Sequence, residues 1–181
     1  MSRIAIPTVD NTVEASKPLL AAVQKQLGIV PNLMKLMGNS PAALEGYLSL
    51  NGALGKGSLS VQLRERIALT IAEYNACDYC LSAHDYLARN VAKISANEID
   101  EARLASSEDA RTKAALQFAL RVAQTRGRVS GTELAAIREF GFDDAAIVEI
   151  VSNVAVNVLT NYINNVALTD IDFPAVHAKA A

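Results

Sequence analysis

The sequence predicts an all-α protein, and three observations support that class. No run of alternating β-branched residues in the 181-residue chain is long enough for a strand. Apolar residues recur instead at helical spacing, as Leu63, Ile67 and Ile71 do. Serine or aspartate precedes several of these stretches and glycine follows them, which is the usual chemistry of helix ends.

The N-terminal residues 1–39 are predicted to form a helical lead-in. Ser16 and Pro18 favour the start of one helix, Gly28 favours its end, and Pro31 favours the start of a second. The two expected helices cover 16–27 and 31–37. No long linker rich in proline or glycine interrupts the chain, so we expect one domain over residues 1–181.

The expected core covers residues 40–174. Ser40, Ser60 and Asp143 are each expected to cap the start of a helix, and Asp143 precedes the last one. Gly127 is expected to end a helix. The expected core helices cover 42–54, 61–75, 78–91, 95–104, 107–126, 131–139 and 144–168. Residues 175–181 form a tail, expected as an arm or a loose end.

The composition excludes several classes of protein. Apolar residues make up 51% and charged residues 20%, which is typical of a globular chain, and the net charge of -2 predicts neither nucleic-acid nor membrane binding. The N-terminus lacks a signal-peptide pattern, so we expect a cytoplasmic protein. The stretch 150–169 carries no charge, but its five asparagines favour a helix buried in the domain or in a subunit interface over a membrane span.

Four residues carry the predicted chemistry: Glu65, Cys77, Cys80 and His84, spaced as Glu-x11-Cys-x-x-Cys-x-x-x-His. A Cys-x-x-Cys pair can close and reopen a disulfide, while a nearby carboxylate and imidazole can move the protons that the redox steps require. Cys77 is expected at a helix N-terminus, where the dipole favours a thiolate. This set indicates a thiol-based redox enzyme.

Helical periodicity predicts how these residues meet. Cys80, His84, Leu87 and Val91 fall on one stripe, and the two apolar members predict that the stripe faces inward. On the preceding helix, Glu65 falls on a largely apolar flank, which suits it to exchange protons near neutral pH.

Other interpretations of the motif stay open. A cysteine pair and a histidine can be half of a zinc site, although a closed site needs four ligands and the only other histidine is His177 in the tail. Covalent haem attachment needs a histidine directly after Cys80, where Leu81 stands. Two cysteines that only pack in a core are a third interpretation. We expect no metal and no cofactor.

The motif resembles the signature of the alkyl hydroperoxidase D-like family, within the carboxymuconolactone decarboxylase superfamily. The similar residues are Leu63-Arg64-Glu65, Cys77-Asp78-Tyr79-Cys80 and His84. The similarity covers the chain from about Ser40 onward, and the closing Ile171-Asp172-Phe173-Pro174 is similar to the peroxidase-related branch of the family. The resemblance implies a helical fold that assembles into trimers or hexamers. Tyr79 stands where some members have histidine.

The resemblance also implies roles. Cys80 would attack the peroxide and form a sulfenic acid, Cys77 would resolve it into a disulfide, and His84 with Glu65 would relay protons. A lipoyl-bearing or thioredoxin-like dithiol protein would reduce the disulfide. We therefore expect a thiol-dependent alkyl hydroperoxidase or disulfide reductase in antioxidant defence.

Two other functions remain as alternatives. One is a carboxymuconolactone decarboxylase-like lyase or hydrolase that acts on a small acid or lactone through His84 and Glu65; the other is a non-enzymatic redox sensor.

Self-association is expected from the last helix, where Ile147, Val151, Val154, Val158 and Tyr162 line one face and Val148, Ala155, Leu159 and Ile163 line another.

Overall fold

The computed structural model describes residues 1–179, and within that range the regular structure is entirely helical. The all-α class is therefore confirmed. The elements are the 3-10 helix η1 (Glu14–Ser16) and the helices α1 (Lys17–Leu27), α2 (Asn32–Met37), α3 (Pro41–Leu54), α4 (Val61–Tyr74), α5 (Asp78–Asn90), α6 (Ala96–Arg103), α7 (Ala110–Thr125), α8 (Gly131–Glu139) and α9 (Asp144–Ala167).

Side-chain caps set most of the helix starts where the sequence placed them. Ser40 and Ser60 accept hydrogen bonds from backbone N–H groups three residues ahead, and Asp143 does the same for α9. Helix α7 differs, because it starts at Ala110 and not near Ser107. The carboxylate of Asp109 accepts the Thr112 N–H at 2.7 Å, so the stronger acceptor nearer the helix forms the cap.

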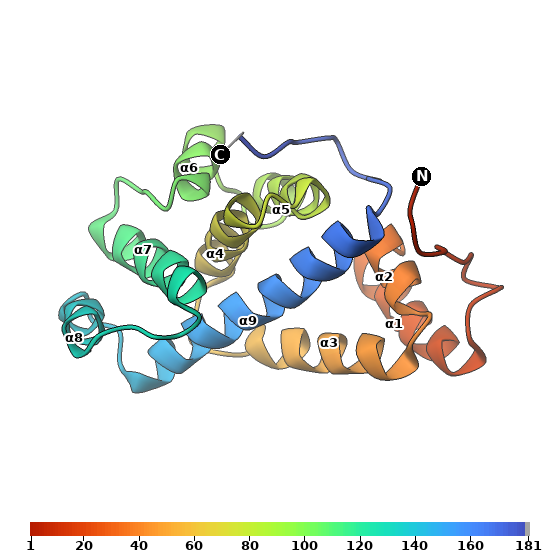
Figure 1. Ribbon diagram of the computed structural model, residues 1–181, viewed down its shortest axis with the longest axis horizontal. Helices are drawn as coiled ribbons and strands as arrows, with labels where there is room; N and C mark the ends of the chain where they lie inside the picture. The colour runs from red at the N-terminus through yellow and green to blue at the C-terminus, as the bar shows by residue number, and fades with distance from the viewer. Residues whose placement is uncertain (180–181) are drawn as a thin grey trace.

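Helix α4 is the centre of the arrangement, in contact with α5, α6, α7 and α9 (Figure 1). Its apolar residues, with those of the neighbouring helices, form the buried core; Ile67, Leu69, Ile71, Leu81 and Ile150 are among the fully buried side chains. Helices α7 and α8 lie at one end of the molecule, and α1 and α2 lie at the other (Figure 1). The hairpin of α4 and α5 packs against α6 and α9, and α4 also packs against α7.

Helix α9 is the one described helix that is long and apolar enough to cross a membrane, and half of its most apolar stretch is buried inside the fold. It packs against α3, α4, α5 and α7. Asn153, Asn157, Asn161 and Asn164 are buried on the packed side. This placement matches the expectation of a helix buried in the domain.

One side of α9 nevertheless remains uncovered by residues 1–179. The exposed apolar stripe of α9 comprises Val148, Val151, Leu159, Tyr162 and Val166. The two faces proposed from the sequence are wrong in detail, because Ile147 and Val154 are buried while members of both expected faces share the exposed stripe. The asparagines, and not only the apolar residues, occupy the side turned toward α4, which moves the apolar stripe outward.

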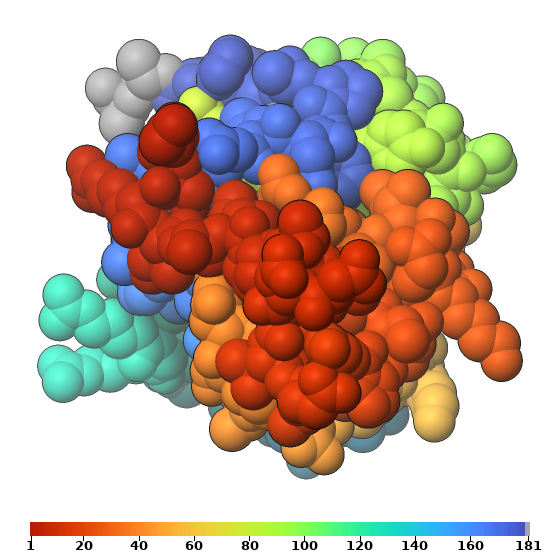
Figure 2. All heavy atoms as spheres, turned by 90° about the vertical axis from the view of Figure 1, so that its right-hand side faces the viewer, coloured from red at the N-terminus to blue at the C-terminus, as the bar shows by residue number. Residues whose placement is uncertain are grey.

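The N-terminal segment lies against α9, and the C-terminal segment lies against α5. The N-terminal segment lies beside the end of α9 (Figure 2), where Arg3 N donates to Ala167 O at 2.6 Å. Beyond Pro174, the chain returns along α5, and Val176 N donates to Ser82 Oγ at 2.9 Å. Ala178 N donates to Asp78 at 2.9 Å. The described part of the expected tail is therefore an arm, while residues 180–181 lie outside the described range.

Candidate active site at the start of helix α5

The turn between α4 and α5 places both cysteines at a helix start. Ala76 adopts a left-handed conformation with φ of 48°, which reverses the chain after α4. Cys77 is the N-cap of α5, and its Sγ accepts the Cys80 N–H at 3.3 Å. The two residues form a disulfide across a Cα–Cα distance of 5.3 Å. Both side chains are buried, with exposed fractions of 0% for Cys77 and 3% for Cys80.

Glu65 and His84 form a contact between the neighbouring helices α4 and α5. His84 Nδ1 lies 2.8 Å from Glu65 Oε2, and both side chains are mostly buried. An ionised carboxylate only accepts hydrogen bonds, so Nδ1 carries a proton and Nε2 of the neutral ring is free to accept one. The expected pairing of these residues is present, and Glu65 lies beside the fully buried Leu69 and Ala72 as its helical angle predicted.

A cavity of about 380 Å³ joins this pair to the disulfide. Cys80, His84 and Glu65 line it, and Cys77 does not. Much of the remaining wall is apolar or aromatic, formed by Leu33, Met34, Tyr47, Ala68, Leu87 and Phe173. Cavities of this size and lining are typical of sites for small organic molecules.

All four members of the stripe through Cys80 and His84 line this cavity, and Cys80 is also part of the buried core. The expectation that the stripe is buried along its length is wrong at Val91, which is 62% exposed. Val91 lines the cavity, as do the exposed residues Leu27, Ile29 and Tyr86. The cavity therefore opens to solvent between apolar side chains.

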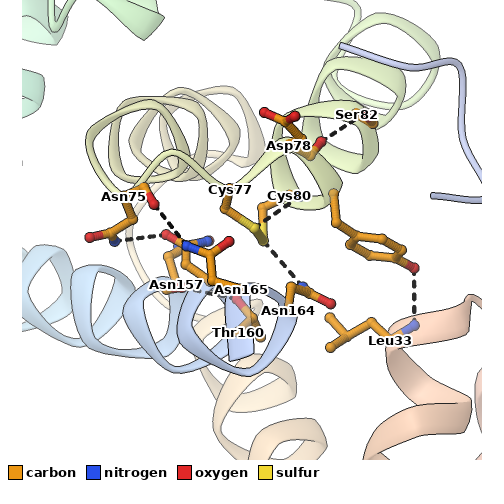
Figure 3. Close-up of a disulfide and its surroundings, with 12 residues drawn as sticks. Leu33, Asn75, Cys77, Asp78, Cys80, Ser82, Asn157, Thr160, Asn164 and Asn165 are labelled. Carbon is orange, nitrogen blue, oxygen red and sulfur yellow. Dashed lines mark hydrogen bonds between the residues drawn. A yellow bond between two sulfur atoms is a disulfide. The ribbon is translucent and has the colours of Figure 1, made fainter. Parts of the chain in front are cut away.

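Asn164 is a site residue that the sequence reasoning missed. Its Nδ2 donates to Cys80 Sγ at 3.3 Å, and the side chain is only 2% exposed (Figure 3). An N–H aimed at a sulfur favours the thiolate over the thiol once the disulfide is reduced. A buried asparagine next to others in an apolar helix was the available signal, but its partner lies 84 residues away.

A second asparagine contact fixes the turn before Cys77. Asn165 Nδ2 donates to Asn75 O at 2.8 Å (Figure 3). Asn75 Nδ2 in turn donates to Asn161 Oδ1 at 2.9 Å. These bonds connect the end of α4 to α9. They hold the disulfide turn against the helix that carries Asn164.

Tyr79, between the two cysteines, connects three segments around the cavity. Its hydroxyl donates to Asp172 Oδ1 at 2.9 Å and accepts the Leu33 N–H at 3.0 Å. Phe173 packs edge-on against the Tyr79 ring at 5.9 Å. Burial, with a smaller contribution from Asp172, raises the pKa of Tyr79 well above its ordinary value, so the hydroxyl remains a donor.

Tyr47 adds a second protonated hydroxyl to the cavity wall. Burial, together with the charge of Glu65, raises the pKa of Tyr47 to about 12. The phenol therefore stays neutral at physiological pH and can donate a hydrogen bond to a bound oxygen. No sequence spacing had linked Tyr47 with the motif.

The described residues offer no set of ligands for the zinc site considered from the sequence. Within residues 1–179, no three histidine, cysteine, aspartate or glutamate side chains converge as a metal site requires. His177, the second histidine, lies 2.7 Å from Asp78 Oδ2 on the outer side of α5. Its contact connects the C-terminal arm with the helix.

Comparison with known proteins finds one matching family model. The sequence pattern of the carboxymuconolactone decarboxylase family matches residues 41–125, which include all four predicted site residues. A search of curated proteins found no match.

Several solved structures share the fold. A peroxidase-related protein from Ralstonia eutropha JMP134, described as an alkylhydroperoxidase AhpD core, is 26% identical, with a TM-score of 0.83 over 94% of this chain and 92% of that chain. One from Silicibacter sp. TM1040 is 23% identical, with a TM-score of 0.81 over 93% and 91%. The debrominase Bmp8, solved with 2,3,4-tribromopyrrole, is 20% identical, with a TM-score of 0.72 over 93% and 94%.

Proposed function

We propose that this chain, which belongs to the AhpD-like carboxymuconolactone decarboxylase superfamily, is a thiol-dependent peroxidase that reduces organic hydroperoxides. The observation that carries the proposal is that Cys80, already paired with Cys77, lines the same cavity as the Glu65–His84 pair. A thiol and an acid–base pair in one cavity, with a second thiol bonded to the first, supply what the reduction of a peroxide requires.

In the first step, His84 Nε2 accepts the thiol proton of Cys80, directly or through a water molecule. The thiolate attacks the terminal oxygen of the hydroperoxide, and the O–O bond breaks. Cys80 becomes a sulfenic acid, and the alkoxide takes the proton from His84 to leave as an alcohol. Glu65 orients the ring through Nδ1 and stabilises the imidazolium that forms between these events.

In the second step, the Cys77 thiolate attacks the Cys80 sulfur. The S–O bond breaks, hydroxide leaves and is protonated to water, and the disulfide forms. An external dithiol then donates two electrons and two protons, and becomes a disulfide itself. We assign this reductant to a lipoyl-bearing or thioredoxin-like protein of the cytoplasm, where such dithiols are kept reduced.

Cys80 is the better candidate for the first attack. Cys80 lines the cavity and its Sγ accepts the Asn164 N–H, whereas Cys77 is fully buried and does not line the cavity. A peroxide in the cavity therefore reaches Cys80 first. Cys77 is one helical turn away, which suits it to resolve the sulfenic acid.

The direct test is to mix reduced protein with cumene hydroperoxide and to follow disulfide formation by mass spectrometry. Turnover is then counted with dihydrolipoamide as reductant. We expect repeated turnover that Cys80→Ser abolishes while the helical circular dichroism is retained. Turnover that survives this substitution would remove the proposal.

The assay also separates the other candidate functions. The similarity in fold to a debrominase makes 2,3,4-tribromopyrrole a useful second substrate, since reductive loss of bromide would use the same dithiol. Slow disulfide closure without turnover would favour a redox sensor. Activity on a small acid or lactone that survives thiol alkylation would favour a lyase or hydrolase that uses His84 and Glu65.

We also propose that the protein functions as a homo-oligomer. The exposed apolar stripe of α9 runs the length of the helix without a charged residue, with Val148 and Val166 each 64% exposed. A second copy that covers this stripe would remove a continuous apolar surface from water. The trimeric or hexameric state expected from the family resemblance would use such a face.

A further inference from the structure

We propose that the preferred substrate is an organic hydroperoxide that also carries a carboxylate, and that Arg64 binds this carboxylate. The inference rests on the proposed peroxidase function for the identity of the reacting group. The carboxylate site itself follows from the surroundings of Arg64 in the cavity.

Arg64 differs from the other partly buried arginines. Within residues 1–179 there are three, and Arg66 and Arg103 each contact a carboxylate, at 2.5 Å from Glu98 and 2.6 Å from Glu73. The side chain of Arg64 makes no ion pair and no hydrogen bond in the same range. The Nε atoms of Arg64 and Arg66 are both buried without a partner, so the missing carboxylate is what distinguishes Arg64. A partly buried guanidinium without a counter-ion is less favourable than a paired one, and a bound anion would offset that cost.

Arg64 lines the cavity, and its guanidinium lies near the end of α3. Its Nη1 lies 3.5 Å from the position that a Cβ on Gly55 would occupy, so it rests against the end of α3. The carbonyl end of a helix favours a positive charge, which helps to keep the side chain there. Five N–H donors in a planar fork can then bind the two oxygens of a carboxylate.

The position of Arg64 along the cavity separates it from the reacting sulfur. His84 lies one turn beyond Cys80, about 6 Å along the axis of α5. Arg64 precedes Glu65, the partner of His84, and α4 starts at the end of the hairpin away from the cysteines. A substrate whose peroxide reaches Cys80 would therefore place a group beyond the acid–base pair, within reach of Arg64.

The size and lining of the cavity favour an organic body between these two ends. Hydrogen peroxide is little larger than a water molecule, which occupies about 30 Å³ in the liquid, and the cavity measures about 380 Å³. Leu33, Met34 and Leu87 supply apolar contacts along it. The Glu65 carboxylate pairs with His84 Nδ1 and not with Arg64, so the guanidinium is left for another anion.

Binding is tested first, on the oxidised protein, with probes that contain no peroxide. Titration calorimetry would compare 4-isopropylbenzoate with the neutral 4-isopropylbenzamide. We expect the carboxylate to bind about tenfold tighter or more, as a charged hydrogen bond contributes. Arg64→Gln should remove this preference, and the matched Arg128→Gln, which removes an exposed charge outside the cavity, should keep it.

Turnover is tested second, with the hydroperoxides of 4-isopropylbenzoic acid and of cumene. In the wild type, kcat/KM should favour the acid about tenfold, and Arg64→Gln should lose that ratio through KM while kcat is held. Equal binding of the benzoate and the benzamide, or a preference that survives Arg64→Gln, would overturn the inference. If Arg64→Gln does not fold, Arg64→Lys and the loss of the wild-type preference at high salt decide the question.

The two measurements distinguish this inference from the proposed function. If the protein binds the carboxylate more tightly than the amide but neither hydroperoxide oxidises Cys80, the carboxylate site is supported and the peroxidase function is excluded. Rapid oxidation of Cys80 by both hydroperoxides at equal rates, without a charge preference in binding, would leave the peroxidase and remove the site.

Discussion

Glu65 Oε2 lies 2.8 Å from His84 Nδ1, so a residue of α4 sets the orientation of the imidazole on α5. The contact leaves Nε2 without a partner among residues 1–179, on a side chain that lines the cavity with Cys80. A base whose second nitrogen is fixed by a carboxylate is the common arrangement for activating a nucleophile.

Loss of the imidazole should slow the reaction without affecting the fold. We expect His84→Gln to reduce the rate of disulfide closure by peroxide by roughly 10²–10⁴-fold, the usual contribution of a general base. Stopped-flow measurement of closure in single turnovers would give this rate. Asp85→Asn, which changes the neighbouring residue and its surface pair with Arg89, should retain the rate. Equal rates in wild type and His84→Gln would exclude the proposed relay.

Asn164 should favour the thiolate of Cys80. In Asn164→Leu the sulfur loses the N–H at 3.3 Å, so a smaller fraction of Cys80 is ionised at neutral pH and alkylation by iodoacetamide is slower. Absorbance at 240 nm against pH would measure the ionisation directly. Asn97→Leu is the control, because Asn97 is exposed on α6, where its Nδ2 donates to Glu101. An unchanged thiolate titration in Asn164→Leu would show that the bond has no effect on ionisation.

Removal of the Tyr79 hydroxyl should destabilise the wall of the cavity. In Tyr79→Phe the buried Leu33 N–H and the Asp172 carboxylate both lose a partner. We expect the free energy of unfolding to fall by about 1–3 kcal/mol. Urea unfolding would measure this, and hydrogen exchange should show faster exchange at Leu33. Tyr86→Phe serves as the control. Unchanged protection of Leu33 would contradict the role of the hydroxyl.

Glu149 should make the stability depend on pH in the acid range. Hydrogen bonds from the backbone of Ser58 hold the pKa of Glu149 below its ordinary value of 4.5, against the opposing effect of burial, and Leu59 N–H adds to them. The folded state thus binds fewer protons than the unfolded state between the folded pKa and 4.5. The stabilisation is complete above 4.5 and is lost as the pH falls through the folded pKa.

The corresponding variant is Glu149→Gln. At pH 7 we expect it to be less stable than the wild type by about 1–2 kcal/mol, and the difference should shrink as the pH falls below 4.5. Urea unfolding at a series of pH values would show this. A difference that stays constant down to the lowest pH would mean that the carboxylate charge is not the cause.

The proposed oligomer should depend on the exposed apolar stripe of α9. Leu159→Asp places a charge at the middle of the stripe, so we expect it to shift the protein to a monomer in sedimentation velocity at micromolar concentration. Leu104→Asp changes an exposed leucine on a different surface and should leave the assembly intact. A wild type that sediments as a monomer would exclude the proposal.

Local sequence features predicted the parts of the structure that local forces decide. Helix starts at Ser40, Ser60 and Asp143 follow from single side chains that accept nearby N–H groups. The contact between Glu65 and His84 was also predictable. The two residues lie on adjacent helices joined by a short turn, and the 3.6-residue period determines the face of the helix on which each side chain lies.

Contacts between distant segments were not predictable in this way. Asn164 reaches Cys80 across 84 positions, and Asp172 reaches Tyr79 across 93. Neither contact leaves a periodic trace, because each depends on how α9 and the segment after it pack on the hairpin. Val91 shows the same limit, since periodicity marks an apolar stripe but does not say whether a core or a cavity lies opposite.

Cys77 has two roles at once, as a partner in the disulfide and as the N-cap of α5. A thiolate is a stronger hydrogen-bond acceptor than a disulfide sulfur, so the helix start interacts more favourably with the reduced protein. Electrochemically, this preference shifts the couple toward a less negative midpoint potential. In the proposed peroxidase cycle, the helix start would thus supply part of the driving force for reducing the disulfide after each peroxide.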